Sequence, residues 1–91
     1  MLKSVRHRAL RRAVRGDRSG LPPEHAARIT RILRELDIAV TPRDMALPGY
    51  RLHALKGRLA GYWSVRVSAN RRILFRMKDG DVFDVDLADY H

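Results

Sequence analysis

The first half of the chain repeats its apolar residues with the spacing of helices. Between residues 8 and 14, leucine, alanine and valine return at helical intervals, which predicts a short helix. Gly16 and the pair Ser19-Gly20 should end this helix, because glycine and serine favour turns. The preceding residues 1–7 show a weaker alternation that is compatible with a short edge strand.

A second helix is expected to begin at Pro22-Pro23-Glu24, because a proline in the first turn of a helix has no backbone hydrogen bond to lose. Its apolar stripe consists of Ala26, Ile29, Ile32, Leu33 and Leu36. Its opposite face, which we interpret as a solvated charged surface, carries Arg28, Arg31, Arg34 and Glu35. Thr41-Pro42 should stop the helix, and a loop should follow it.

Beyond Tyr50, apolar and polar residues alternate, which predicts strands. We expect three of them, at residues 62–67, 71–77 and 81–87. Helices followed by strands are typical of the α+β class. The 91 residues suffice for a single core, so we predict one domain over residues 1–91, with two N-terminal helices packed on one face of a mainly antiparallel, twisted sheet.

A loop of three residues, 68–70, sets the register of the first predicted hairpin. It places two apolar pairs on the face toward the helices, Val65 with Ile73 and Trp63 with Phe75. On the other face, Arg66 lies opposite Arg72. Like charges in such a pair are destabilising, so either Asp86 on the next strand offsets them or they are held for an anion, and the two readings are compatible. The polar side chains expected on this face are Tyr62, Arg66, Arg72, Arg76, Asp84 and Asp86.

Two loops compete for the second predicted hairpin. A two-residue turn, Asp79-Gly80, would place Phe75 opposite Asp84 and so mix an apolar face with a polar one. We therefore predict a three-residue loop that includes Lys78, with Gly80 in the left-handed conformation. That register pairs Phe75 with Phe83 and Ile73 with Val85.

Composition narrows the classes of partner and of chemistry. The net charge of +9, with sixteen arginines among nineteen cations, favours a polyanion such as nucleic acid. A solvated basic surface, an acidic protein partner and a GC-rich genome remain alternative explanations of the arginine excess.

There is no cysteine, and the four histidines lack ligand spacing, so we expect neither a metal nor another cofactor. No apolar run approaches the roughly 20 residues that span a bilayer, and the N-terminus lacks the apolar core of a signal peptide, so we expect a soluble cytoplasmic protein with no membrane contact.

Groups that can move protons lie toward the end of the chain. His53 and Lys56 are three residues apart, just before a turn bracketed by glycines. Histidine exchanges protons near neutral pH and is therefore a common acid-base catalyst. The sequence then ends on Asp89-Tyr90-His91, directly after the last predicted strand, which would deliver these side chains to the edge of the sheet.

Six pieces of the sequence occur in a characteristic order. They are Met1-x-Lys3-Ser4 with His7, Leu52-His53-x-Leu55-Lys56-Gly57, Gly61-Tyr62-Trp63-Ser64-Val65, Asn70-x-Arg72-Ile73 with Phe75, Asp79-Gly80-Asp81 and Asp89-Tyr90-His91. Together they resemble the HigB branch of the RelE/ParE type II toxin superfamily, the plasmid maintenance system killer proteins, over nearly the whole chain. The chain departs from that pattern at Ser68, where relatives often carry asparagine, and at Arg71, where they often carry an aromatic residue.

The resemblance implies a RelE-like fold that binds RNA on the face of the sheet opposite the helices. It implies a ribosome-dependent endonuclease that cuts messenger RNA codons in the A site, without a metal, by attack of the 2′-OH on the phosphate. The partner that it implies is a helix-turn-helix antitoxin of the HigA kind, with a toxin-antitoxin heterotetramer as one expected assembly. The catalytic positions carried over are His53, Lys56, Arg72, Tyr90 and His91, and the expected RNA contacts are Tyr62, Arg66, Arg71, Arg76 and Asp89.

The roles of these residues are a hypothesis. Either His91 or His53 would transfer each proton, Arg72 and Lys56 would stabilise the transition state, and Tyr90 would stack on or orient a base. Two other functions remain open, since fold does not fix activity. One is a ParE-like gyrase inhibitor, which lacks this catalytic set, and the other is a non-catalytic module that binds RNA or DNA. An enzyme acting on a small acidic metabolite fits less well, because a sheet edge offers no obvious deep pocket.

Overall fold

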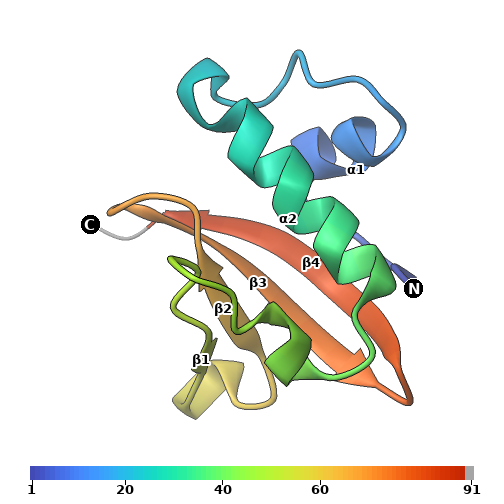
Figure 1. The fold of residues 1–91 in the computed structure, drawn as a ribbon, viewed down its shortest axis with the longest axis vertical. Coiled ribbons are helices and arrows are strands. Elements are labelled where there is room, and N and C mark those ends of the chain that lie inside the picture. Colours follow the sequence, from blue (N-terminus) through green and yellow to red (C-terminus); the bar gives the residue numbers. More distant parts are fainter. Residues whose placement is uncertain (90–91) are drawn as a thin grey trace.

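The computed structural model describes residues 1–89 and shows two helices against one face of a four-stranded antiparallel sheet (Figure 1). The helices are α1 (Arg8–Val14) and α2 (Ala26–Ile38), and the strands, in sheet order, are β1 (His53–Ala54), β2 (Trp63–Arg66), β3 (Arg71–Lys78) and β4 (Asp81–Asp89). Three short 3₁₀ helices connect them: η1 (Pro23–His25), η2 (Pro42–Met45) and η3 (Gly57–Leu59). The predicted α+β class and arrangement are confirmed. Within the described part of the chain, no helix has the length and apolar character to cross a bilayer.

The two helices begin and end close to the positions predicted. The His7 side chain caps α1 by accepting a hydrogen bond from the backbone N–H of Ala9. The chain turns away after α1 at Gly16, where φ is +98°, a conformation that glycine adopts without strain. Helix α2 continues from η1, so the proline-rich start forms a 3₁₀ turn before the α-helix begins.

The core lies between α2 and the sheet. Helix α2 contributes the predicted stripe, of which Ile29, Ile32, Leu33 and Leu36 are buried and Ala26 packs at the edge. The sheet contributes Val65, Ile73, Phe75, Val82 and Val85, and Leu10 of α1 closes one side. Because successive strand residues point to opposite faces, this set identifies the face of the sheet that the helices cover.

The N-terminal residues run beside β4 and widen the sheet. Leu2 and Val5 form isolated parallel bridges with Val82 and Val85 of β4. The alternation of residues 1–7 thus corresponds to two bridges rather than to a continuous edge strand. Ser4, which lies between the two bridges, contacts Asp84 of β4, where the pairing of β4 with β3 is irregular.

The first hairpin has the predicted register. Strand β2 pairs with β3 so that Val65 faces Ile73, Trp63 faces Phe75 and Arg66 faces Arg72. Strand β1 was not predicted from the alternation. It pairs with β2, with His53 opposite Ser64, and forms a short edge strand of the sheet.

The predicted register of the second hairpin is wrong. Lys78 pairs with Asp81, so the turn contains only Asp79 and Gly80, and both have positive φ, +54° and +82°. This combination matches the twist of a hairpin and suits the Asp-Gly sequence. Phe83 consequently lies opposite Arg76 instead of Phe75.

A β-bulge in β4 then restores the apolar face. Between the pairs formed by Arg76 and Leu74, β4 advances one residue more than β3. The extra residue is accommodated at Asp84, whose φ is +54°. Val85 therefore still reaches the core, while Ile73 pairs with Leu87 rather than with Val85.

Candidate functional site

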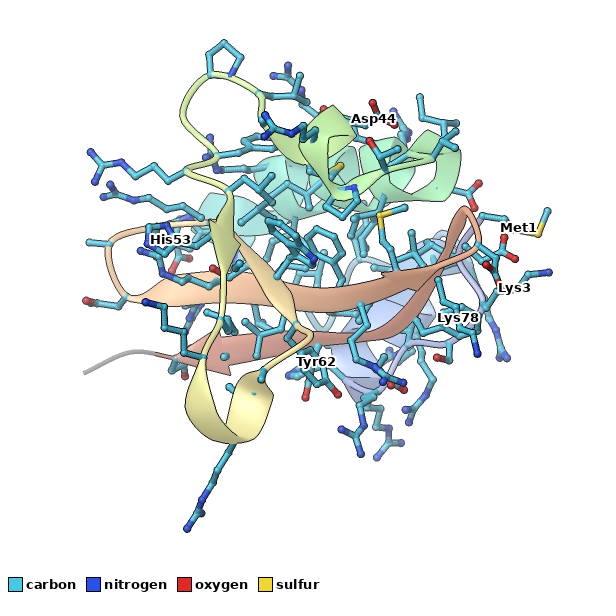
Figure 2. The ribbon with its side chains drawn as sticks, turned by 90° about the horizontal axis from the view of Figure 1, so that it is seen from below. Met1, Lys3, Asp44, His53, Tyr62 and Lys78 are labelled. Carbon is cyan, nitrogen blue, oxygen red and sulfur yellow. The ribbon has the colours of Figure 1, made fainter. Side chains whose placement is uncertain are left out.

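The face of the sheet turned away from α1 and α2 carries most of the predicted site, and we call it the distal face. It is viewed from below in Figure 2, with the helices behind the strands. By alternation from the core residues, its side chains on β2 and β3 are Ser64, Arg66, Arg72, Leu74 and Arg76. Ser64 and Leu74 are buried without belonging to the main core. The segment from β1 to η3 lies on this side of the sheet in both views (Figures 1 and 2).

Two arginines face each other on the distal face. Arg66 and Arg72 are direct partners across β2 and β3, and both are half-buried. The expected register would have placed Asp86 opposite Arg72. The two-residue turn and the bulge each shift β4 by one residue, so Asp86 lies opposite Leu74 and Ala88 lies opposite Arg72. The Asp86 carboxylate accepts a hydrogen bond from the backbone of its neighbour Leu87.

Helix α2 fixes the backbone of one member of this pair, Arg66. Arg28 donates to the carbonyl of Arg66, from Nε at 3.2 Å and Nη2 at 2.9 Å, and also to the carbonyl of Gly49 at 2.9 Å. Its guanidinium lies 5.1 Å from the ring centroid of Tyr50, a cation–π distance. Arg28 is therefore a structural clamp, and the interpretation of its side chain as part of a solvated face is wrong.

His53 and Lys56 lie at the β1 edge of the same sheet. His53 is exposed and lies opposite Ser64, two residues along β2 from Arg66 and on the same face of the sheet. Ideal sheet spacing puts the Cα atoms of His53 and Arg72 roughly 12 Å apart, within the span of a nucleotide held between long side chains. Lys56 is exposed on the turn that follows β1, and the backbone N–H of Leu55 ties this turn to Tyr62.

Tyr62 and Arg76 meet at the other end of the distal face, as expected. The Arg76 guanidinium lies 5.6 Å from the Tyr62 ring centroid and forms an ion pair with Asp84, at 2.7 Å from Nη2 to Oδ2. Arg6, which was not predicted to belong to the site, also lies here, because its Nη1 donates to the Tyr62 hydroxyl at 3.4 Å. The alternation of residues 1–7 was the available signal, since a segment beside β4 can reach this face.

Arg71 and Asp89 form the last pair of β3 and β4. Their side chains make an ion pair, with 3.1 Å between Nε and Oδ1. Because neighbouring strand residues point to opposite faces, Arg71 lies on the side of the helices and not beside Arg72. Clefts of about 280 and 230 Å³, lined in part by His25 and His7, flank this ion pair.

Tyr90 and His91 lie outside the described residues. Of the other predicted positions, the structure brings five to one face of the sheet: His53, Tyr62, Arg66, Arg72 and Arg76. Among residues 1–89, no group of three or more His, Cys, Asp or Glu side chains is arranged to hold a metal ion.

Comparisons with known proteins agree with this architecture. Residues 3–91 match the model of the HigB RelE-like toxin of type II toxin-antitoxin systems. The chain is 38% identical over 92 residues to the endoribonuclease HigB of Proteus vulgaris, with full coverage of both proteins.

Solved structures share the fold at lower identity. A YoeB–YefM complex from Staphylococcus aureus matches with a TM-score of 0.64 and 17% identity, covering 100% of this chain and 98% of the other. A YoeB/ParE toxin from Agrobacterium tumefaciens matches with a TM-score of 0.61 and 21% identity, covering 99% and 96%. The chain therefore belongs to the family of RelE-like HigB toxins of type II toxin-antitoxin systems.

Proposed function

We propose that this toxin is a ribosome-dependent endoribonuclease that cuts messenger RNA codons in the A site. The 2′-OH of one nucleotide attacks the adjacent phosphate and expels the 5′-oxygen of the next nucleotide. This reaction needs a base, an acid and cations that stabilise the charge growing on the phosphate, but it needs no metal. The name of the Proteus vulgaris relative supports the activity, since that protein is an endoribonuclease of the same family.

The observation that carries the proposal is the direct opposition of Arg66 and Arg72 on the distal face, with His53 in the neighbouring row. Placing two guanidinium groups opposite each other costs stability. A phosphate can be bound by both side chains, because arginine binds phosphate oxygens through paired N–H groups. The pair therefore presents two cations side by side to one anion.

Each predicted catalytic residue has a role in the proposed reaction. Arg72 and Lys56 stabilise the charge on the phosphate, and Arg66 binds the RNA backbone beside them. His53 and His91 share the two proton transfers, and Tyr90 stacks on or orients a base.

The remaining predicted contacts are divided between the two ends of the sheet. Tyr62 and Arg76 bind RNA at the far end of the distal face. Arg71 supports the site through Asp89, from which Tyr90 and His91 continue the chain.

We further propose that a helix-turn-helix antitoxin of the HigA kind neutralises the toxin, and that the two proteins assemble as a heterotetramer. A Staphylococcus aureus YoeB–YefM structure is such a toxin-antitoxin heterotetramer, on the same fold. A substrate on the ribosome places the active toxin in the cytoplasm.

The test is cleavage of a defined messenger RNA on purified ribosomes, read by primer extension and by analysis of the product ends. We expect cuts in the A-site codon that leave a 2′,3′-cyclic phosphate and a 5′-hydroxyl. Deleting His91 should lower the cleavage rate by at least about 10²-fold while leaving ribosome binding unchanged. Unchanged toxicity of that variant, or gyrase inhibition without RNA cleavage, would favour a non-catalytic module or a ParE-like toxin instead.

A further inference from the structure

Tyr62 joins three parts of the chain that lie far apart in the sequence. Its hydroxyl accepts a hydrogen bond from Arg6 of the N-terminal segment, and its ring attracts Arg76 of β3. We call these three residues the tyrosine cluster. Tyr62 is half-buried and both arginines are exposed, so the cluster is open to a ligand.

The side chain of Arg76 on β3 is held in place by Asp84 of β4. Arg76 contacts Asp84 Oδ2 through Nε at 2.9 Å and through Nη2 at 2.7 Å. Asp84 has a left-handed conformation, and its backbone N–H donates to Ser4 Oγ at 2.8 Å. The bulge and the N-terminal segment thus position Arg76 against the ring before any ligand arrives. This reduces the entropy lost on binding.

The tyrosine cluster lies at a defined distance from the arginine pair. Arg72 and Arg76 are four residues apart on one strand, so they share a face and are separated by roughly 13 Å. A single strand of stacked nucleotides covers that distance in about four residues at 3.4 Å each, and an unstacked strand covers it in fewer.

We propose that the tyrosine cluster is a second RNA subsite, in which a base stacks on Tyr62 while Arg6 binds the adjacent phosphate. The inference rests on the proposed function for the position of the scissile phosphate at Arg66 and Arg72. The subsite engages a nucleotide two to four positions away from that phosphate. Stacking on an aromatic ring tolerates every base, so this subsite adds affinity for RNA without adding codon preference.

A purely structural role for Tyr62 makes different predictions. In that case the ring only packs on the distal face of the sheet. Its removal would lower the melting temperature but would not change how binding depends on salt or on RNA length. RNA binding by full-length toxin variants therefore separates the two roles.

The experiment measures binding of fluorescent 2′-O-methyl RNA oligonucleotides, from three to nine nucleotides long, to the full chain at several salt concentrations. The wild type should gain affinity once the oligonucleotide exceeds about four nucleotides. Tyr62→Ala should bind long oligonucleotides, and only these, about tenfold more weakly, and Tyr62→Phe should lose much less affinity.

Arg6→Ala should lower the slope of log affinity against log salt by about 0.7, the contribution of one phosphate contact on a single strand. Arg15→Ala, which removes an exposed arginine from the end of α1, is the matched control and should show no length-dependent loss.

The RNA bound at the cluster can come from messenger or from ribosomal RNA, and a second arm distinguishes them. If Tyr62→Ala weakens binding to vacant ribosomes and leaves the oligonucleotide series unchanged, the tyrosine cluster binds ribosomal RNA and the proposed subsite beside the scissile phosphate is refuted. If neither measurement changes, or if Arg15→Ala reproduces the losses, the subsite is refuted. Cleavage by the wild type is scored separately, so a failure of the proposed catalysis is visible even when the binding results hold.

Discussion

The arginines of the helical layer and those of the distal face serve different purposes. Residues 1–40 carry ten Lys or Arg against four Asp or Glu, a net charge of +6, whereas residues 41–91 carry nine against six, a net charge of +3. Charge density alone would direct a polyanion to the helices. Several arginines of the helical layer are nevertheless engaged within the fold. Arg11 donates to the carbonyls of Val5 and Arg6, and Arg12 binds Asp17.

The ion pair of Arg12 illustrates this structural use. The hydroxyl and backbone N–H of Ser19, together with Arg12, lower the pKa of Asp17 to about 2.

On the distal face, in contrast, Arg66 and Arg72 oppose each other, and Arg6 and Arg76 surround an aromatic ring. Net charge attracts a polyanion over a distance, but the arrangement of the cations decides where it is bound and cleaved. Substitutions of the helical arginines that are engaged within the fold should therefore affect stability, and substitutions on the distal face should affect RNA chemistry.

The largest expected effect belongs to Arg72. Arg72→Ala should lower cleavage on the ribosome by about 10²–10³-fold, because it removes a preorganised cation from the transition state. The neighbouring variant Arg71→Ala, on the other side of the same strand, should change the rate far less. Single-turnover cleavage and thermal melting of both variants give the measurement. Equal losses in the two variants would refute the division between the two faces.

A helical arginine should show the opposite behaviour. Arg28→Ala removes charged hydrogen bonds to two carbonyls and should destabilise the fold by about 2 kcal/mol. Below the melting temperature, the folded variant should still cleave RNA. Urea denaturation measures the loss, with Arg34→Ala, an exposed arginine on the same helix, as the control. A stable Arg28→Ala protein that fails to cleave would place Arg28 in the site.

The bulge that supports Arg76 can be tested with a pair of substitutions. Asp84→Ala should cost about 1–2 kcal/mol, because alanine is strained at a φ of +54°. Asp84→Gly also loses the ion pair with Arg76 but adopts this conformation freely, so it should be more stable than Asp84→Ala. The melting temperatures of the two variants decide the point, and equal values would mean that backbone strain is not the cause.

The smallest effect concerns Tyr50, which packs beneath Arg28. Burial, followed by the hydrogen bond to Glu35, raises the pKa of Tyr50 to about 12 from its usual value of 10.0. A raised pKa means that Tyr50 stabilises the fold fully below pH 10 and progressively less as the pH rises toward 12. Tyr50→Phe should cost about 1 kcal/mol at neutral pH, and its deficit should shrink between pH 10 and 12. Denaturation curves over that range provide the measurement. A constant deficit would mean that Tyr50 does not titrate differently in the folded and unfolded states.

Much of the fold follows from local pattern. The stripe from Ile29 to Leu36 and the register of Val65 with Ile73 were predictable, because each depends on a period of apolar residues near in sequence. The opposition of Arg66 and Arg72 follows directly from that register, so the centre of the candidate site was predictable too.

The features that were missed depend on contacts between distant segments. The bulge at Asp84 requires Ser4, 80 residues away in the sequence. The clamp made by Arg28 requires the carbonyl of Arg66, and the position of Arg6 requires Tyr62. A hydrophobic pattern carries no information about such pairs, so the second register and the role of Arg28 were predicted incorrectly.

The central claim is that RNA in the ribosomal A site contacts the distal face and not the more basic helices. Photo-crosslinking from 4-thiouridine in the A-site codon to the bound toxin, followed by mass spectrometry, tests it directly. We expect cross-linked peptides from β2 and β3, in particular those containing Tyr62, Arg66 or Arg72. Cross-links confined to peptides of α1 and α2 would contradict the account.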